Sequence, residues 1–272
     1  MVRDADVVAR RWAEAFGVRR SPARSEGTDR RVTEIYFDNL TVEVSQPSGG
    51  ASIWSDFLNR HGEGIHHVAF EVPRVDDAVA ALEKHGGRRV MGVSGPSVFI
   101  DFDAEMGGGI ELLPASQAAP EARAGADPGT TVAALGHLTS AIEPARLFWR
   151  GVLGTDVPAA RDTRGVPFPA DCGCDREAYI REVNIRTLTP GLNLIQPVGG
   201  VSVWRRLIER HEGLAYLQFN LPDQAALDAR IARLLELGGV RTLGDAGAPY
   251  AYVDMQRQLG MTLLLVKTTP AR

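Results

Sequence analysis

The sequence predicts an α+β fold of four tandem βαβββ units that form two open, curled mixed β-sheets. The main observation is an internal duplication, because SIWSDFLNRHGEGIHHVAFEV, starting at Ser52, is echoed by VSVWRRLIERHEGLAYLQFNL, starting at Val201. In both copies a short helical pattern with a Trp leads through Arg-His and a Glu-Gly turn into an alternating strand. The order of the other predicted elements also repeats in the two halves of the chain.

The first half opens with a helix over residues 4–17, which has an Asp near its start and a Gly at its end. An Asp-Asn turn then joins two alternating segments, residues 32–37 and 40–46, into a predicted hairpin. The Trp54 helix follows. The half is completed by a strand, a helix ended by glycines, and three further strands, at residues 64–72, 76–87, 89–93, 97–103 and 109–113.

The second half repeats this order after an Ala, Pro and Gly rich segment from Pro114 to Gly129 that has no hydrophobic period. We therefore expect a first domain at residues 1–115, a linker at 116–130 and a second domain at 131–272. The predicted elements are a strand, a helix, a hairpin, a strand, a helix and three strands, at residues 131–142, 144–154, 179–188, 192–197, 213–221, 223–239, 240–244, 249–255 and 261–267.

Composition favours a globular protein with small-molecule partners. The chain has 272 residues, and 44% of them are hydrophobic, so it is long and apolar enough to bury a sizeable core. Its net charge is −4. No basic stripe interleaves with aromatic residues, so nothing favours nucleic acid or an anionic membrane. No signal peptide or long apolar run is recognisable, and Cys172 and Cys174 are read as two loop thiols. We expect a cytoplasmic protein.

Strand parity places four polar residues on one side of the predicted sheets. In GIHHVAFEV the apolar residues two apart share one face, which leaves His67 on the other. By the same alternation, Glu34, Glu43 and Glu111 point away from the apolar residues of their own strands. One His with two or three carboxylates on rigid strands is a plausible site for a divalent metal.

These elements, with the segment from Trp54 to Val72 and GGGIELL from Gly107 to Leu113, resemble the vicinal oxygen chelate superfamily of glyoxalases, bleomycin-resistance proteins and extradiol dioxygenases. The first half is most similar to methylmalonyl-CoA epimerase. The resemblance implies a concave face that holds one divalent metal, either Co, Mn, Ni, Zn or Fe. It also implies that the ligands are Glu43, His67 and Glu111, and that Glu34 and Glu111 are the catalytic carboxylates, with Glu34 as the base.

A base beside a Lewis acid suits proton abstraction next to a carbonyl, because the metal stabilises the enolate. The sequence therefore predicts a metal-dependent isomerase, epimerase or lyase acting on a small carbonyl or vicinal-oxygen substrate. Two alternatives stay open. One is a non-haem iron dioxygenase of the same fold, which expects two His and one carboxylate. The other is a metal-free small-molecule binding or resistance protein.

The resemblance implies one more ligand, a His on the opening strand of the first unit. The chain opens MVRDADVVARRW, already at the end of that strand. Either the start is truncated relative to the natural gene product, or another segment fills the gap, or the protein has abandoned its metal. A missing edge strand also invites pairing with another chain, so a homodimer is one expected assembly.

The second half is expected to be degenerate as a metal site. It keeps His137 on its first strand, but Asn193 and Tyr216 replace the carboxylate and the histidine of the first half. An Asn and a phenol cannot hold a divalent ion with a single His. This half is therefore predicted to be a structural partner, or a pocket in which His137, Asn193 and Tyr216 bind an organic ligand.

Overall fold

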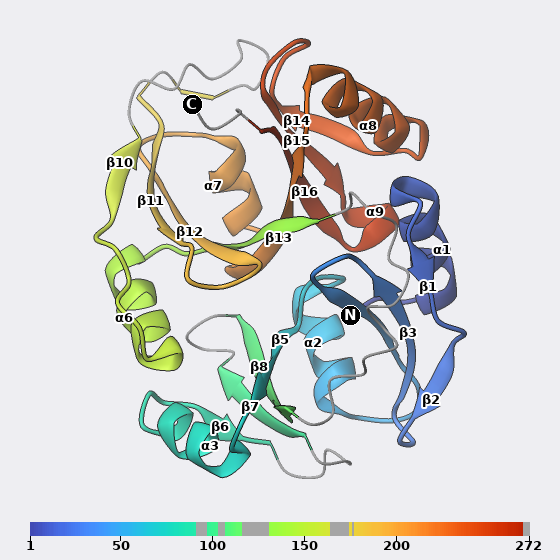
Figure 1. Cartoon of the computed structure of the whole chain (residues 1–272), viewed down its shortest axis with the longest axis vertical. Helices are drawn as coiled ribbons and strands as arrows, with labels where there is room; N and C mark the ends of the chain where they lie inside the picture. The colour runs from blue at the N-terminus through green and yellow to red at the C-terminus, as the bar shows by residue number, and fades with distance from the viewer. Residues whose placement is uncertain (91–96, 103–106, 116–130, 164–173, 176, 269–272) are drawn as a thin grey trace.

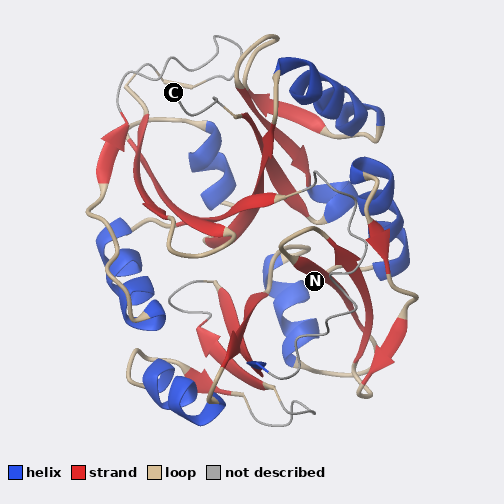
Figure 2. Ribbon diagram, in the orientation of Figure 1, coloured by secondary structure: helices blue, strands red, loops and turns tan. Residues whose placement is uncertain are grey.

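The computed structural model describes residues 1–90, 97–102, 107–115, 131–163, 174–175 and 177–268. The predicted linker, residues 116–130, lies outside the described residues, and so does part of the strand expected at residues 89–93. Figures 1 and 2 show curled sheets with helices around and inside them. The predicted α+β class is confirmed.

The second half forms one continuous eight-stranded sheet. Its central strand is β9, which runs parallel to β12 on one side and antiparallel to β13 on the other. It therefore joins the third and fourth βαβββ units into a single curled layer (Figure 1). In order across the sheet the strands are β10 (Arg161–Thr163), β11 (Tyr179–Ile185), β12 (Gly191–Val198), β9 (Val132–Leu138), β13 (Gly213–Leu221), β16 (Met261–Lys267), β15 (Tyr250–Met255) and β14 (Val240–Leu243).

The first half forms two separate four-stranded sheets. In one, β3 pairs with β1, β2 and β4, and in the other the order is β5, β8, β7 and β6. Within the described ranges no strand of the chain lies between β4 and β5. The strands are β1 (Arg19–Arg20), β2 (Arg24–Glu26), β3 (Arg30–Tyr36), β4 (Thr41–Pro47), β5 (His67–Val72), β6 (Arg88–Arg89), β7 (Val98–Phe102) and β8 (Gly108–Pro114).

The first helix begins and ends at the signals that the sequence offers, whereas the helices predicted at residues 76–87, 144–154 and 223–239 differ from their predicted bounds by one to four residues. The Asp4 side chain caps the first helix and Gly17, with a φ of 69°, ends it. The duplicated helices α2 and α7 share the same cap, because Ser52 and Ser202 each accept a hydrogen bond from the amide three residues later. The described helices are α1 (Ala5–Phe16), α2 (Ile53–His61), α3 (Val75–Glu83), α6 (Ile142–Leu153), α7 (Val203–Ile208), α8 (Gln224–Glu236) and α9 (Gln256–Leu259).

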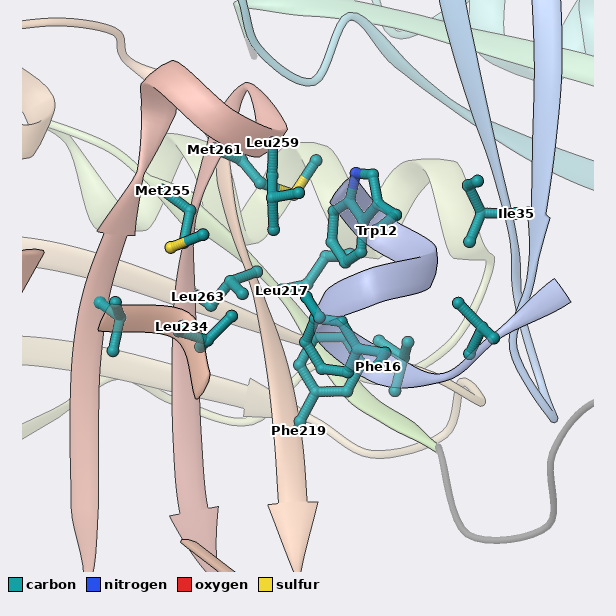
Figure 3. Close-up of a cluster of buried hydrophobic side chains, with 14 of the residues drawn as sticks. Trp12, Phe16, Ile35, Leu217, Phe219, Leu234, Met255, Leu259, Met261 and Leu263 are labelled. Atoms are coloured by element: carbon teal, nitrogen blue, oxygen red, sulfur yellow. The ribbon is translucent and has the colours of Figure 1, made fainter. Parts of the chain in front are cut away.

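Two of the hydrophobic cores are shared between the halves. Helix α1 of the first unit packs on the sheet of the fourth unit, where Trp12 is fully buried and the Phe16 ring lies 4.5 Å from that of Phe219 (Figure 3). A second core joins α3 of the second unit to α6 of the third, where Phe102 meets Phe148 at 4.8 Å. The predicted domain boundary thus divides a chain whose halves are held together by common apolar packing.

Two features depart from the sequence reading. The short strands β1, β2 and β10 and the four-residue helix α9 were not predicted, because segments this short carry no readable period. Cys174 is disulfide-bonded, so the reading of both cysteines as thiols was wrong for this residue. Among the described residues, none of the helices is long and apolar enough to cross a membrane.

Replacing Trp12 by Ala should destabilise the whole chain, because its side chain is 0% exposed and lies in the core shared by two units. We expect the free energy of unfolding to fall by roughly 3–5 kcal/mol, as measured by urea denaturation. Leu147→Ala is the control, since Leu147 is 53% exposed and its loss should change the value by less than about 0.5 kcal/mol. Equal effects of the two substitutions would contradict a shared core.

Candidate functional site

A cavity of about 710 Å³ lies where the first half faces the second. The first half contributes both polar and apolar side chains, and the second half contributes mainly apolar ones. All four residues predicted from strand parity line this cavity, namely Glu34, Glu43, His67 and Glu111. Leu135, Leu192, Leu217 and Met261 line it from the second half.

The register of the strands explains why the polar residues share a face. Glu34 on β3 and Glu43 on β4 are directly opposite each other in the antiparallel pair. On the other sheet Glu111 of β8 is opposite Ala69 of β5, two residues from His67 and therefore on the same face. Ile35 and Val44 are buried in the core that includes α1, and Ile110 and Leu112 are buried in the core that includes α3.

His67 is engaged through both ring nitrogens. Its Nε2 lies 3.4 Å from Glu111 Oε2, and its Nδ1 lies 3.0 Å from His66 Nδ1. His66 is buried and stacks on Phe99, with the two ring centroids 5.2 Å apart. The sequence reading of His66 as a packing residue is consistent with this burial, although His66 also lines the cavity.

The charges of this cluster follow from its burial. Burial, together with the neighbouring His67, holds the pKa of His66 well below its usual range, so His66 is neutral. Burial alone would raise the pKa of Glu111, but the contact with His67, with smaller effects of Ser97 and Arg30, outweighs it. The pKa of Glu111 falls to about 2, so this carboxylate is ionised at neutral pH.

Arginines pair with the other two carboxylates. Arg30 Nη1 donates to Glu43 Oε1 at 2.7 Å, and its guanidinium lies 4.4 Å from the centre of the Trp54 ring. Arg24 Nη2 donates to Glu34 Oε1 at 2.8 Å, while the Tyr36 hydroxyl donates to the other Glu34 oxygen at 2.7 Å. Each predicted carboxylate thus already has a cationic partner.

The described residues, as arranged, do not form the predicted metal site. In the part of the chain that the structure describes, no group of three or more His, Cys, Asp or Glu side chains is placed to hold a metal ion. Glu43 is drawn to Arg30, whereas His67 and Glu111 face each other. The residues as arranged do not fit a three-ligand metal, and no chemical step is derived through one.

Sequence reasoning missed Arg30, the most buried of these cations. Its side chain is only 6% exposed and it pairs with Glu26 as well as Glu43. The signal was available, because Arg30 is four residues before Glu34 on the same strand and therefore has the same parity. An Arg on the same face as a predicted metal site competes with a metal ion for the carboxylates of that site.

The second-half set is not brought together. Asn193 and Tyr216 are both opposite Gly136, so they share one face, whereas His137 is opposite Leu194 and points to the other. Tyr216 is fully buried within a core that includes Trp204 of α7. His137 instead accepts a hydrogen bond at its Nδ1 from Trp149 Nε1, 2.8 Å away. His137 therefore lies on the opposite face of the sheet from Asn193 and Tyr216.

Burial of His137 should make stability fall in mild acid. Burial lowers its pKa to about 4, whereas an unfolded His titrates near 6.5. The unfolded state therefore binds the proton more strongly, so stability is complete above about pH 6.5 and is lost progressively toward about pH 4. At ~1.4 kcal/mol per pKa unit, the loss is roughly 3 kcal/mol.

His137→Gln should flatten this pH dependence, measured by urea denaturation at several values between pH 4 and 7, because Gln carries no titrating group. The exposed His85→Gln is the matched control and should keep the slope of the parent chain. An unchanged slope in the His137 variant would show that another group causes the acid sensitivity.

Comparison with known proteins agrees with this architecture. Residues 1–98 match the model of the Glyoxalase/Bleomycin resistance protein/Dioxygenase superfamily. A search of curated protein sequences gives no match. A triple mutant of 4-hydroxymandelate synthase from Streptomyces coelicolor superposes with a TM-score of 0.70 at 14% identity, covering 100% of this chain and 91% of that one.

Two further solved structures are similar at lower scores. A xylose isomerase-like TIM barrel/4-hydroxyphenylpyruvate dioxygenase fusion protein has a TM-score of 0.56 at 15% identity, covering 100% of this chain and 48% of its own. Methylmalonyl-CoA epimerase from Mycobacterium tuberculosis has a TM-score of 0.36 at 17% identity, over 52% of this chain and 89% of that one. Such identities show a shared fold and do not identify a reaction. The resemblance predicted from the sequence is confirmed: residues 1–98 match the Glyoxalase/Bleomycin resistance protein/Dioxygenase superfamily, and the chain has the vicinal oxygen chelate fold.

Proposed function

We propose that this chain binds a small carbonyl or vicinal-oxygen compound on the polar face of the cavity, without a metal ion. The observation that carries the proposal is the internal pairing of every predicted metal or catalytic group. Glu34, Glu43 and Glu111 each contact a basic side chain, and His67 is engaged at both nitrogens. A site arranged in this way has hydrogen-bonding groups fixed in place, as a ligand pocket requires.

Arg24 is the cation best placed to bind an oxygen of the ligand. It lines the cavity, and its side chain is 46% exposed while it holds Glu34. A guanidinium has five N–H donors, so contact with one carboxylate leaves donors free for a ligand oxygen. A carbonyl or a pair of neighbouring oxygens matches the planar arrangement of these donors.

The first test measures ligand binding with and without metal. Small 2-oxo acids, diones and catechols are titrated calorimetrically in chelator and again with added Mn²⁺ or Co²⁺. We expect one class to bind with the same Kd in both conditions. Arg24→Gln should weaken it about tenfold, since a hydrogen bond to a charged group contributes about 1.5–3 kcal/mol.

Arg88→Gln is the matched control, because Arg88 is 73% exposed, pairs with Asp101 and is not part of the cavity lining. Its affinity for the ligand should equal that of the parent chain. Binding that appears only with added metal, with stoichiometric metal found by elemental analysis and lost in His67→Ala, would overturn the metal-free proposal.

A second candidate is an isomerase, epimerase or lyase that works by proton abstraction, and one observation favours it. Two acid–base pairs, Glu34 with Arg24 and Glu111 with His67, line the same cavity from two different sheets. Epimerisation removes a proton from one side of a carbon and returns one to the other, so it needs two such groups. Here Glu34 would accept the proton and Arg24 would stabilise the enolate oxygen.

Proton exchange with solvent tests this candidate directly. A compound that binds is incubated in deuterated water, and loss of its proton beside the carbonyl is followed by NMR. Glu34→Gln should reduce exchange by about 10²–10⁴-fold, the usual contribution of a positioned base. The control is Glu143→Gln, a carboxylate that is 53% exposed on α6. If the compound loses this proton in the presence of the parent chain no faster than in free solution, the proton-abstraction candidate is wrong and binding is the only function that remains.

A further inference from the structure

The two halves exchange hydrogen bonds at the ends of helices α1 and α8. The last four carbonyls of an α-helix have no partner within the helix and need other donors. In α1 the carbonyl of Ala13 accepts from Gly17 N at 2.8 Å. The last turn of this helix has the sequence AEAF, which includes no basic side chain. The next two carbonyls, those of Glu14 and Ala15, take their donors from the other half of the chain.

These donors are two arginines of α8. Arg233 Nε donates to Glu14 O at 3.2 Å. Arg230 Nη1 donates to Ala15 O, and the guanidinium lies 4.7 Å from the centre of the Phe16 ring. Burial lowers the pKa of Arg230, yet an arginine stays charged in proteins, and a positive charge is favourable at a helix C-terminus. The end of α1 is therefore capped by cations that belong to the fourth unit.

The capping is reciprocal, because α1 supplies a donor for the end of α8. Arg11 Nη1 donates to Leu237 O at 3.1 Å. The preceding carbonyls of Leu234 and Leu235 accept from the two glycine amides that follow the helix, both at 2.9 Å. The arginine contacts follow opposite orders along the two helices, so the end of each helix lies beside the middle of the other.

The other pair of helices that joins the halves, α3 and α6, has its ends closed locally. After α3 the carbonyl of Leu82 accepts from two amides of the following turn, at 2.9 and 3.1 Å. On α6, Arg146 Nη1 donates to Val157 O at 3.3 Å, in the segment that follows the same helix. These two units are joined by an apolar core. Capping across the halves is therefore an addition at α1 and α8, and not a general requirement for joining units.

We propose that Arg11, Arg230 and Arg233 form a reciprocal clasp that fixes the rotation and the axial position of α1 on the fourth unit. Apolar burial has no preferred direction, so it would let α1 turn or slide within the shared core. Hydrogen bonds are directional, and three of them between two helices restrict α1 to one arrangement. Since α1 shares a core with Ile35 of β3, the clasp also determines where the sheet that carries Glu34 lies against the second half. The clasp would act whether or not the cavity binds a ligand.

Hydrogen exchange of the backbone amides, followed by NMR on the full chain, tests the clasp by its effect across the halves. Arg11→Met keeps an apolar stem but removes the donor, so the amides at residues 237–239 of α8 should exchange about tenfold faster. The double variant Arg230→Met with Arg233→Met should have the converse effect, about tenfold faster exchange at residues 16 and 17 of α1. The amides of β9, at the centre of the eight-stranded sheet, should keep their rates in both variants.

Two matched controls separate the clasp from a general loss of stability. Arg146→Met removes a donor to a carbonyl of its own unit, so its effect should stay near residue 157 and leave α3 unchanged. Arg10→Met replaces the exposed neighbour of Arg11 and should leave the rates at residues 237–239 unchanged. Faster exchange confined to the helix that carries the substitution, faster exchange throughout the chain including β9, or no change at either helix end would each overturn the proposal.

Discussion

The backbone hydrogen-bonding requirement of strand edges is the constraint on which this structure depends. One strand, β9, satisfies two edges at once and turns two βαβββ units into a continuous sheet of eight strands. In the first half the described strands belong to two separate sheets, and Val2 N donates to Ser45 O beside β4. The pairing of β9 with both neighbours therefore explains why the sheet of the second half is continuous.

The first half is held together by apolar packing against the second half. Trp12 and Phe16 of α1 pack in a core with Phe219 and Leu263 of the fourth unit, and α3 shares a second core with α6. Burial of such aromatic side chains contributes several kcal/mol each and has no directional requirement. Packing of this kind can hold the β3–β4 and β5–β8 sheets in place against the second half.

Electrostatics then determine what the cavity can hold. Four polar residues converge on the cavity, but a carboxylate in a partly buried place binds whichever cation is near enough. Arg30 is buried beside Trp54 and donates a hydrogen bond to Glu43. The contact of Glu111 with His67 lowers the pKa of Glu111 to about 2. The residues that suggested a metal site are thus arranged as separate pairs. In these pairs the side chains that would bind a small molecule are held in place by their neighbours.

The sequence by itself determined the elements and the faces of the strands. Its period-two alternation correctly placed Glu34, Glu43, His67 and Glu111 on the cavity side, because side-chain direction in a strand depends only on local geometry. The duplication likewise predicted the repeated units, and the structure shows that both copies of the duplicated helix are capped by a serine, Ser52 and Ser202. Short strands such as β10 escaped prediction, since three residues cannot show a period.

Only the tertiary structure decided which of these side chains meet. His137, Asn193 and Tyr216 were predicted to line a pocket from the positions that correspond to the first-half ligands, whereas the pairing of His137 with Leu194 sets it on the opposite face of the sheet from the other two. The pairing of Glu43 with Arg30 likewise joins residues thirteen positions apart through side-chain reach and burial. Strand direction is a local property that a sequence encodes, whereas contact between side chains depends on register and packing across the whole chain.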